Sequence, residues 1–444
     1  MARPIGVDLF AGAGGMSLGF EQAGFDVVAA VELDPVHAAT HKFNFPDCAV
    51  LPKSVTEVSG DEIRRKAGIG DRAVDVVFGG APCQGFSLIG QRALDDPRNA
   101  LVQDFVRIVK ELDATYFVFE NVKGLTVGRH RKFLFELIEE FEAIGYDVQR
   151  DWRVLNAADY GTPQDRQRLI LMGVKNGHTL PVYPSVISKR VTCKDALDDL
   201  PDAEAYPELR DGDAVVTSDF GEPSKYAAGL RGIGNDAWAF GHPRNWEPAE
   251  LTSSARTEHT DISRRRFRET EQGRVEPISR LFKLPADGVS NTLRAGTDAA
   301  RGAFTSPRPI HYRHARCVTV REMARLHGFP DWFRFQATKW HGARQIGNSV
   351  PPPLAQAVAG QIIKALGVRR TRPTAAIDLG DTALLTMNSA QASAHFGVEN
   401  PIGRRDKKSG AKKRSQAEIE ALDAFDRRAQ LVDRVSGERQ LIEG

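Results

Sequence analysis

The stretch IGVDLFAGAGGMSLGFEQAG, residues 5–24, decides the fold of this chain. It begins with a short apolar run, continues through a glycine-rich turn at 11–15, and ends in an apolar pattern at helical spacing that stops at Gly24. A strand, a glycine turn and a helix in this order are typical of a nucleotide-binding crossover unit. The glycines let the backbone approach a ligand closely, because no Cβ atom stands in the way.

The next apolar run, residues 27–33, carries Glu32 near its end, and Asp34 follows directly. An acid at the end of the second strand of such a unit commonly accepts hydrogen bonds from the two hydroxyls of a ribose. A plain glycine turn beside a solvated acid is the alternative interpretation. The glycine turn and the spaced acid together favour a cofactor that contains adenosine.

A second stretch rich in small residues, GGAPCQGFSLIG at 79–90, follows the apolar run 74–78. That run predicts a buried strand, and open α/β sheets bind ligands at the carboxyl ends of their strands. Pro82 fixes the backbone immediately before Cys83. Cys83 is therefore a candidate nucleophile. A small buried hydrophobe is the commonest fate of a free cysteine, so this stretch alone leaves both interpretations open.

Strands and helices continue to alternate up to residue 174, which predicts a parallel, doubly wound sheet. Glu120 stands near the end of one of these strands, and the loop before the last one carries Arg166 and Arg168. The apolar patterns predict helices over 98–112 and 130–145 and extended segments over 116–122, 146–155 and 168–174.

The texture changes at residues 175–315, which are rich in Gly, Pro, Asp and Arg and show no sustained period. Residues 254–274 hold six arginines. Basic residues interspersed with aromatic ones suit a surface that faces phosphates, and a solvated polar face is the alternative.

Regular structure returns at 317–333, where Thr319 is a candidate N-cap with Glu322 three residues later, and again at 346–366. Beyond residue 369 the sequence predicts a tail. The tail is expected to hold a disordered basic run at 403–414 and an amphipathic helix at 415–435.

Composition sets broad limits. The 444 residues suffice for roughly two or three domains, and a net charge of +2 does not by itself argue for nucleic acid. No CxxC pair is present, which disfavours a zinc site or a disulfide framework and suits a reduced, intracellular setting. The N-terminus lacks the pattern of a signal peptide, and no apolar run reaches the roughly 18 residues of a membrane span. The four cysteines are Cys48, Cys83, Cys193 and Cys317.

Taken in order, these blocks resemble the motifs of the DNA cytosine-5 methyltransferases. The resemblance covers residues 1–175 and 316–366, with a weak match at NTLRAG, 291–296, in the region between. The matching strings are DLFAGAGG at 8–15, VELDP at 31–35, APCQGFS at 81–87, FENVKGL at 119–125, YGTPQDRQR at 160–168, RCVTVREMARLHGFPD at 316–331 and QIGNSVPPPLAQAVAGQI at 345–362.

The resemblance implies an α/β fold with a doubly wound, mostly parallel sheet, the Rossmann-like methyltransferase core. A smaller, irregular, β-rich target recognition domain is expected as an insertion. The expected divisions are a catalytic, cofactor-binding core at 1–178, the target recognition domain at 179–315, motifs returning to the core at 316–372 and a charged tail at 373–444.

The resemblance also implies a set of catalytic roles. Cys83, presented by Pro82, attacks carbon 6 of cytosine, because a thiolate is a strong nucleophile that can leave again. Glu120 protonates ring nitrogen 3, and its pKa should be raised by burial to hold that proton. Arg168 holds the carbonyl oxygen of the ring, with Arg166 in support. Ion pairing with nearby acids is the alternative role of the two arginines.

The cofactor implied by the resemblance is S-adenosylmethionine. Glu32 is expected to bind the ribose, Leu101 to pack near it, and Asn348 or Ser349 to contact the methionine end. Leu33 is a further candidate for cofactor binding. Phe10, Gly12 and Gly14 are expected to line the site. The family often has an aspartate after the third strand that accepts a hydrogen bond from the adenine amine; Ser54 stands there, and a hydroxyl accepts more weakly.

The substrate implied by the resemblance is double-stranded DNA from which the target cytosine is flipped out. Residues 84–99 are expected to cover the flipped base, and the variable region is expected to contact the grooves and phosphates. The candidate DNA contacts are Ser87, Gln91, Arg92, Arg98 and Arg294.

The sequence thus predicts a bacterial-type DNA cytosine-5 methyltransferase in a restriction–modification or phage-defence setting. Its expected partners are DNA and a cognate restriction endonuclease or defence-system proteins; a cytoplasmic, nucleoid-associated monomer without membrane contact is expected. An RNA (tRNA) cytosine-5 methyltransferase is one alternative, although the Cys-Phe-Thr motif typical of that branch is absent. A catalytically silent DNA-binding regulator is another, but the intact Cys83, Glu120 and Arg168 argue against it.

Overall fold

The core of the computed structural model is one eight-stranded sheet in the order β3-β2-β1-β4-β5-β8-β6, with β7 also paired to β8. The structure describes residues 2–82, 99–127, 130–234, 236–297 and 305–400. Neighbours from β3 to β5 run parallel, and β8 pairs antiparallel with β5, β6 and β7. The predicted α/β class is confirmed. The strands are β1 (Ile5–Leu9), β2 (Asp26–Val31), β3 (Ala49–Leu51), β4 (Val76–Gly79), β5 (Tyr116–Val122), β6 (Tyr146–Val148), β7 (Arg153–Asn156) and β8 (Gln167–Lys175).

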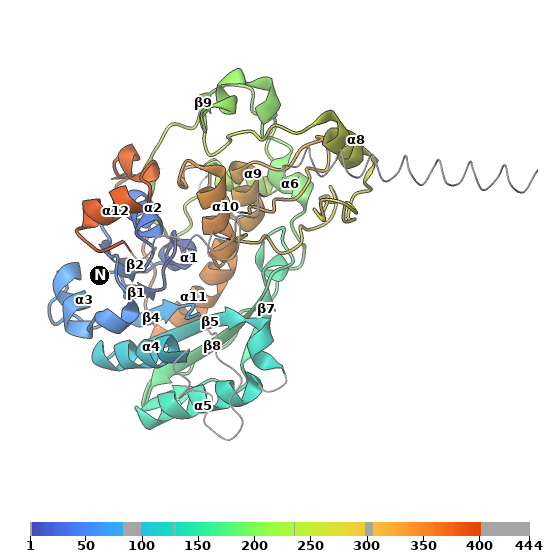
Figure 1. The fold of residues 1–444 in the computed structure, drawn as a ribbon. Coiled ribbons are helices and arrows are strands. Elements are labelled where there is room, and N and C mark those ends of the chain that lie inside the picture. The colour runs from blue at the N-terminus through green and yellow to red at the C-terminus, as the bar shows by residue number, and fades with distance from the viewer. Residues whose placement is uncertain (1, 83–98, 128–129, 235, 298–304, 401–444) are drawn as a thin grey trace, which may run out of the picture.

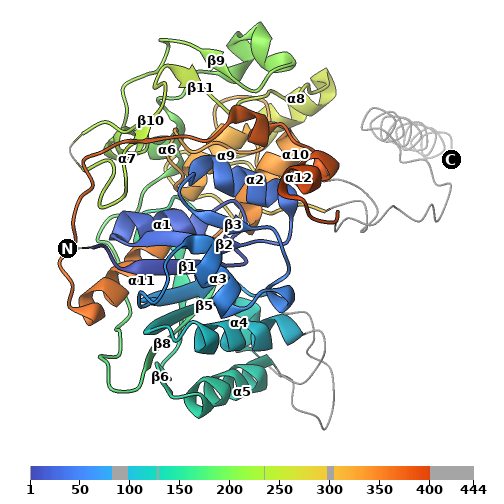
Figure 2. The ribbon, with the colours of Figure 1, turned by 90° about the vertical axis from the view of Figure 1, so that its left-hand side faces the viewer.

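Helices cover both faces of this sheet (Figure 1 and Figure 2). On one face lie α1 (Gly15–Ala23) and α11 (Pro352–Leu366). On the other lie α3 (Gly60–Ala67), α4 (Ala100–Glu111) and α5 (His130–Ala143). Successive side chains of a strand point to opposite faces, so Phe78 stacks on Phe20 of α1 at 3.7 Å between ring centroids, while Phe117 stacks on Phe141 of α5 at 3.7 Å.

The contact between α1 and α11 packs a late segment of the chain against an early one. A Cβ atom at Gly19 would lie 2.5 Å from the Cβ of Ala355 and 2.6 Å from the carbonyl oxygen of Pro352. Only glycine lets the two helices approach so closely. Residues predicted to return to the core therefore pack directly on the first helix of the glycine-turn unit.

Two further helices, α9 (Val320–His327) and α10 (Lys339–Asn348), contribute to a second apolar cluster beside the sheet. Phe45, which directly follows α2 (Pro35–Asn44), belongs to the same cluster. The predicted N-cap of α9 is confirmed, because Thr319 and Glu322 form a reciprocal capping box. The sequence did not predict α10, whose two glycines and scattered polar residues hide its helical period.

The region between the two halves of the core is irregular, and it is less rich in β-structure than predicted. Its strands are two residues long: β9 (Val215–Val216), β10 (Arg244–Asn245) and β11 (Glu250–Leu251). Three short helices accompany them: α6 (Cys193–Leu197), α7 (Lys225–Leu230) and α8 (Asp261–Glu269).

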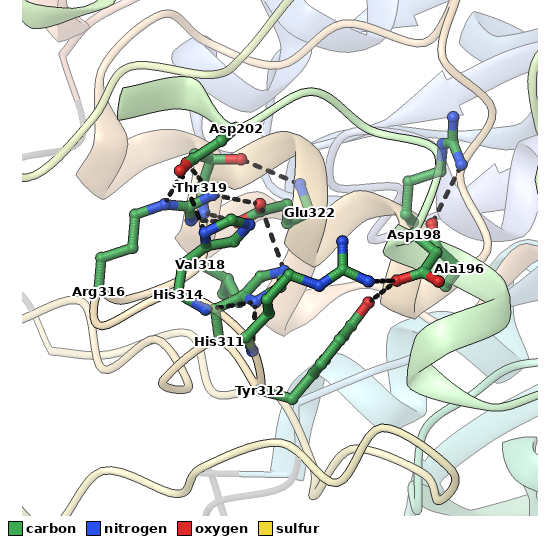
Figure 3. A network of polar contacts seen from close by, with 12 residues as sticks. Ala196, Asp198, Asp202, His311, Tyr312, His314, Arg316, Val318, Thr319 and Glu322 are labelled. Atoms are coloured by element: carbon green, nitrogen blue, oxygen red, sulfur yellow. Dashed lines mark hydrogen bonds and ion pairs between the residues drawn. The ribbon is translucent and has the colours of Figure 1, made fainter. Parts of the chain in front are cut away.

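Side chains, more than strand ladders, hold this region together. Arg316 pairs with both carboxylate oxygens of Glu322 at 2.8 Å and reaches Asp202 at 3.0 Å (Figure 3). This pairing holds the pKa of Glu322 down at about 2. A buried ion network can fix loops that have no regular hydrogen-bonding pattern of their own.

The predicted tail needs correction for residues 373–400, which are folded. They form β12 (Ile377–Asp378), a short 3-10 helix η9 (Thr382–Leu385) and α12 (Ser389–Phe396). Leu384 and Leu385 are buried against α2, and β12 pairs with β10. The few apolar residues are spaced too irregularly for a pattern to reveal them. The predicted basic run at 403–414 and helix at 415–435 lie outside the described residues.

The remaining short 3-10 helices connect these elements. The connecting helices are η1 (Val55–Glu57), η4 (Lys123–Thr126), η5 (Ala157–Tyr160), η6 (Ala203–Ala205) and η7 (Pro207–Arg210).

Within the described ranges, no helix is long and apolar enough to cross a membrane.

Candidate active site and cofactor cavity

A cavity of about 670 Å³ opens at the carboxyl ends of the parallel strands. It lies where β1 has β2 on one side and β4 on the other, the switch point at which ligands of doubly wound sheets bind. One continuous space therefore joins the glycine turn after β1 to the ends of β4 and β5. Of the predicted site residues, it is lined by Phe10, Gly12, Glu32, Leu33, Ser54, Pro82, Leu101, Glu120, Asn348 and Ser349.

Some residues of the glycine turn line the cavity, and others pack against neighbouring side chains. Phe10 and Gly12 have positive φ angles of 62° and 56° and line the cavity. Gly14, with φ of 104°, is not among the lining residues. A Cβ atom there would lie 2.5 Å from the ring of Phe45. Gly14 was predicted to face the cofactor, but the structure makes it a packing position against α2.

Glu32 is fixed at the cavity edge by the backbone. Its Oε2 accepts a hydrogen bond from the amide of Gly12 at 2.8 Å, and its Oε1 accepts one from the amide of Asp34 at 2.8 Å. Burial raises the pKa of Glu32. Each carboxylate oxygen retains a second acceptor position, so the group can still accept from a diol in the cavity.

Ser54 is a weaker acceptor than the sequence suggested. Its Oγ accepts from the amide of Thr56 at 3.3 Å and from the Thr56 hydroxyl at 2.8 Å, because Ser54 caps η1. Both acceptor positions of a hydroxyl oxygen are then taken. An adenine amine in this cavity would need another partner.

Glu120, near the end of β5, lies at the end of the cavity opposite Glu32. Its Oε1 accepts from Nε of Arg168 at 2.8 Å. Burial raises the pKa of Glu120, while Arg168 and Arg166 act in the opposite direction. The raised pKa agrees with the prediction. A Cβ atom at Gly80 would overlap Oε2 of Glu120, so the strand end needs glycine beside this carboxyl group.

Neither Arg166 nor Arg168 is among the residues that line the cavity, and the two arginines have different partners. The Arg166 guanidinium is buried and donates to the carbonyl oxygens of Leu293 at 3.0 Å and Gly347 at 2.7 Å. Burial, with Arg168 nearby, lowers its pKa. Arg166 therefore joins two segments that are distant along the chain.

Several predicted residues lie outside the described ranges: Cys83, Ser87, Gln91, Arg92 and Arg98. Arg294 is described and is exposed. The three residues that follow it, Ala295, Gly296 and Thr297, line the cavity. The weakly matching segment 291–296 thus lies at the mouth of the same space as Glu120.

The cavity also contains residues that the sequence analysis missed. Asp8, at the end of β1, is buried, and burial raises its pKa to about 8, although the Ser17 hydroxyl donates to it at 2.6 Å. His37, Lys53 and Arg344 complete the polar lining. The position of Asp8 inside an apolar strand was the one available signal. No group of three or more His, Cys, Asp and Glu side chains suited to a metal ion occurs in the part of the chain that the structure describes.

A doubly wound sheet with a glycine turn, a ribose-type acid and a buried glutamate around one cavity is typical of enzymes that use a nucleoside-containing cofactor. Residues 6–364 match the family model of C-5 cytosine-specific DNA methylases, and the chain belongs to that family. The resemblance stated from the motifs is confirmed. The protein is a DNA cytosine-5 methyltransferase, and its family implies S-adenosylmethionine as methyl donor.

Curated relatives and solved structures agree with this assignment. The chain is 61% identical over 402 residues to the type II methyltransferase M.XorII of Xanthomonas oryzae pv. oryzae, covering 90% of this chain and 94% of that protein. It is 34% identical over 363 residues to the type II methyltransferase M1.HphI of Haemophilus parahaemolyticus, covering 81% and 86%.

A crystal structure from an Escherichia coli prophage, described as a DNA modification methyltransferase, shares 33% identity with a TM-score of 0.67 and covers 82% of this chain and 100% of that chain. The Dnmt2 methyltransferase of Schizosaccharomyces pombe shares the fold alone, with 14% identity, a TM-score of 0.50 and coverage of 83% of this chain and 100% of that chain.

Proposed function

We propose that the protein is the modification methyltransferase of a type II restriction–modification system, and that it methylates one cytosine in a specific duplex sequence. Two relatives at 61% and 34% identity are type II methyltransferases. A cognate endonuclease that cuts the same unmethylated sequence is the expected partner. The observation that carries the chemistry is the buried Glu120, which lines the same cavity as Glu32 and is paired with the partly buried Arg168.

The cavity suits S-adenosylmethionine. At one end Glu32 offers carboxylate acceptors to a ribose beside Gly12, and Leu33 and Leu101 give apolar surface for the adenine. Asn348 and Ser349 lie at the end of α10 and suit the methionine end. When bound, the cofactor supplies an electrophilic methyl group on a sulfonium.

The residues at the other end activate the base. The Cys83 thiolate adds to carbon 6 of the flipped cytosine, which makes carbon 5 nucleophilic. Glu120 holds a proton at ring nitrogen 3, and Arg168 stabilises the ring oxygen. After methyl transfer the carbon 5 proton leaves, with water as base, and the thiolate is eliminated.

DNA is proposed to approach over the exposed Arg294 and the residues around Cys83. The irregular region 179–315, which carries many arginines, would read the sequence and hold the phosphates. The protein is expected to act as a monomer.

Bisulfite sequencing of DNA from a host that expresses the protein tests this function and gives the recognised sequence. We expect complete protection of one cytosine in one short sequence, and loss of protection with Cys83→Ser. Cys83→Ser should still bind S-adenosylhomocysteine, which shows that the variant is folded. Labelling of tRNA with no label in any DNA would contradict the proposal and favour the RNA-acting alternative.

A further inference from the structure

A series of three buried hydrogen bonds ends at Ser349, which lines the cavity. The amide of Leu293 donates to Oε1 of Gln164 at 3.1 Å. Nε2 of Gln164 lies 2.9 Å from Nδ1 of His327, and Nε2 of His327 lies 3.1 Å from the carbonyl oxygen of Ser349. Gln164 and His327 are completely buried. These hydrogen bonds join four segments that are distant in sequence.

The first bond determines the direction of the other two. A backbone amide can only donate, so Gln164 must present its carbonyl oxygen to Leu293 and its amide nitrogen to His327. Nδ1 of His327 therefore accepts, and the imidazole carries its proton on Nε2 and donates to Ser349. A charged imidazole would place two donors face to face. Burial lowers the pKa of His327, and the charge of Arg166 adds to this effect.

Arg166 makes a second link between the same two ends. It donates to the carbonyl oxygens of Leu293 and Gly347. The backbones also touch directly, because a Cβ atom at Gly347 would overlap the backbone of Ala295. The segment 291–297 and the turn 347–349 are thus held together in three ways.

The two ends of this series of hydrogen bonds lie beside different proposed ligand sites. Leu293 precedes the exposed Arg294, which is proposed to contact DNA, and Ser349 lines the cavity that is proposed to bind the methionine end of the cofactor. The Ser349 hydroxyl donates to the carbonyl oxygen of Gln345 at 2.7 Å, so its turn has no freedom to adjust separately.

We propose that His327 is a positioning residue that couples DNA binding over residues 291–297 to cofactor binding at Ser349. The inference rests on the proposed function, since it takes the ligands of both ends from there. A duplex that binds Arg294 would restrict the position of Leu293. The hydrogen bonds of the neutral imidazole would then restrict the position of the Ser349 backbone as well.

Calorimetry tests the coupling directly. The probe is S-adenosylhomocysteine, titrated into the full chain with and without a duplex that carries the sequence found by bisulfite mapping. In the wild type we expect the duplex to tighten binding by roughly fivefold or more. His327→Leu should lower this ratio clearly, although the links through Arg166 and Gly347 remain. His327→Gln should restore most of the loss, because a glutamine can accept from Gln164 and donate to Ser349.

Controls separate a coupling role from a purely structural one. His395→Leu, at an exposed position of α12, should keep the wild-type ratio. Where His327→Leu does not fold, Gln164→Met breaks the same series of hydrogen bonds at another link and should show the same loss. A wild-type ratio in either folded variant, or no effect of DNA on the wild type, would overturn the coupling. Methyl transfer to DNA by the wild type in such a case would leave the proposed function standing.

Discussion

At the scale of single residues, Glu120 is the group whose environment bears most directly on the chemistry. Burial raises its pKa, so the carboxyl group keeps its proton to a higher pH than a free glutamate does. Since the proposed step needs that proton, the rate of methyl transfer should fall as the pH rises through the raised pKa. Glu120→Gln should lose roughly 10²–10⁴-fold in single-turnover rate, because an amide cannot give up a proton in this way. Its residual rate should show no inflection in this pH range. Glu57→Gln, at an exposed position, is the matched control, and a Glu120→Gln profile that kept the wild-type inflection would assign the titration to another group.

At the scale of secondary-structure elements, the packing of α1 on α11 decides whether the end of the chain completes the core. Gly19→Ala would improve the helix propensity of α1 by up to about 1 kcal/mol, but its Cβ would lie 2.5 Å from the Cβ of Ala355. Overpacking of this kind costs about 1–3 kcal/mol, so we expect a net loss of unfolding free energy in urea denaturation. Gly360→Ala, in α11, is the matched control because nothing lies within 4 Å of its added Cβ. It should be neutral or stabilising, and equal effects of the two changes would refute the close-packing argument.

At the scale of the whole molecule, buried arginines of α9 and its preceding loop join the irregular region to the core. Arg316 serves the network of Figure 3, and Arg325 contacts Asp331 at 2.6 Å and Asp199 at 3.0 Å. Arg325→Met would remove the nearest cation of two buried carboxylates, because Arg231 and Arg321 approach them only at 3.7 Å and 3.8 Å. Such a change costs about 3–5 kcal/mol. Limited proteolysis should then cut first within residues 193–297. Arg372→Met, which removes an exposed pair with Asp236, should change the free energy of unfolding by no more than about 1 kcal/mol. Similar losses in both variants would show that burial of the pair is unimportant.

The sequence by itself determined the sheet, the glycine turn, the acid Glu32 and the cap of α9. These features depend on local periodicity and on residue types with strong conformational preferences, which a linear pattern records. The raised pKa of Glu120 was predicted as well, from the proton-holding role that the family resemblance implies. The order of the motifs along the chain carried the family assignment.

Only the tertiary structure decided where individual side chains point and what they touch. Arg166 and Arg168 are neighbours of the same type in the sequence, yet one is held by Leu293 and Gly347 and the other by Glu120. Gly14 packs on Phe45, and residues 373–400 fold onto α2. These outcomes depend on partners that are distant along the chain. A side chain's burial and hydrogen bonds are set by those partners, which no local pattern contains.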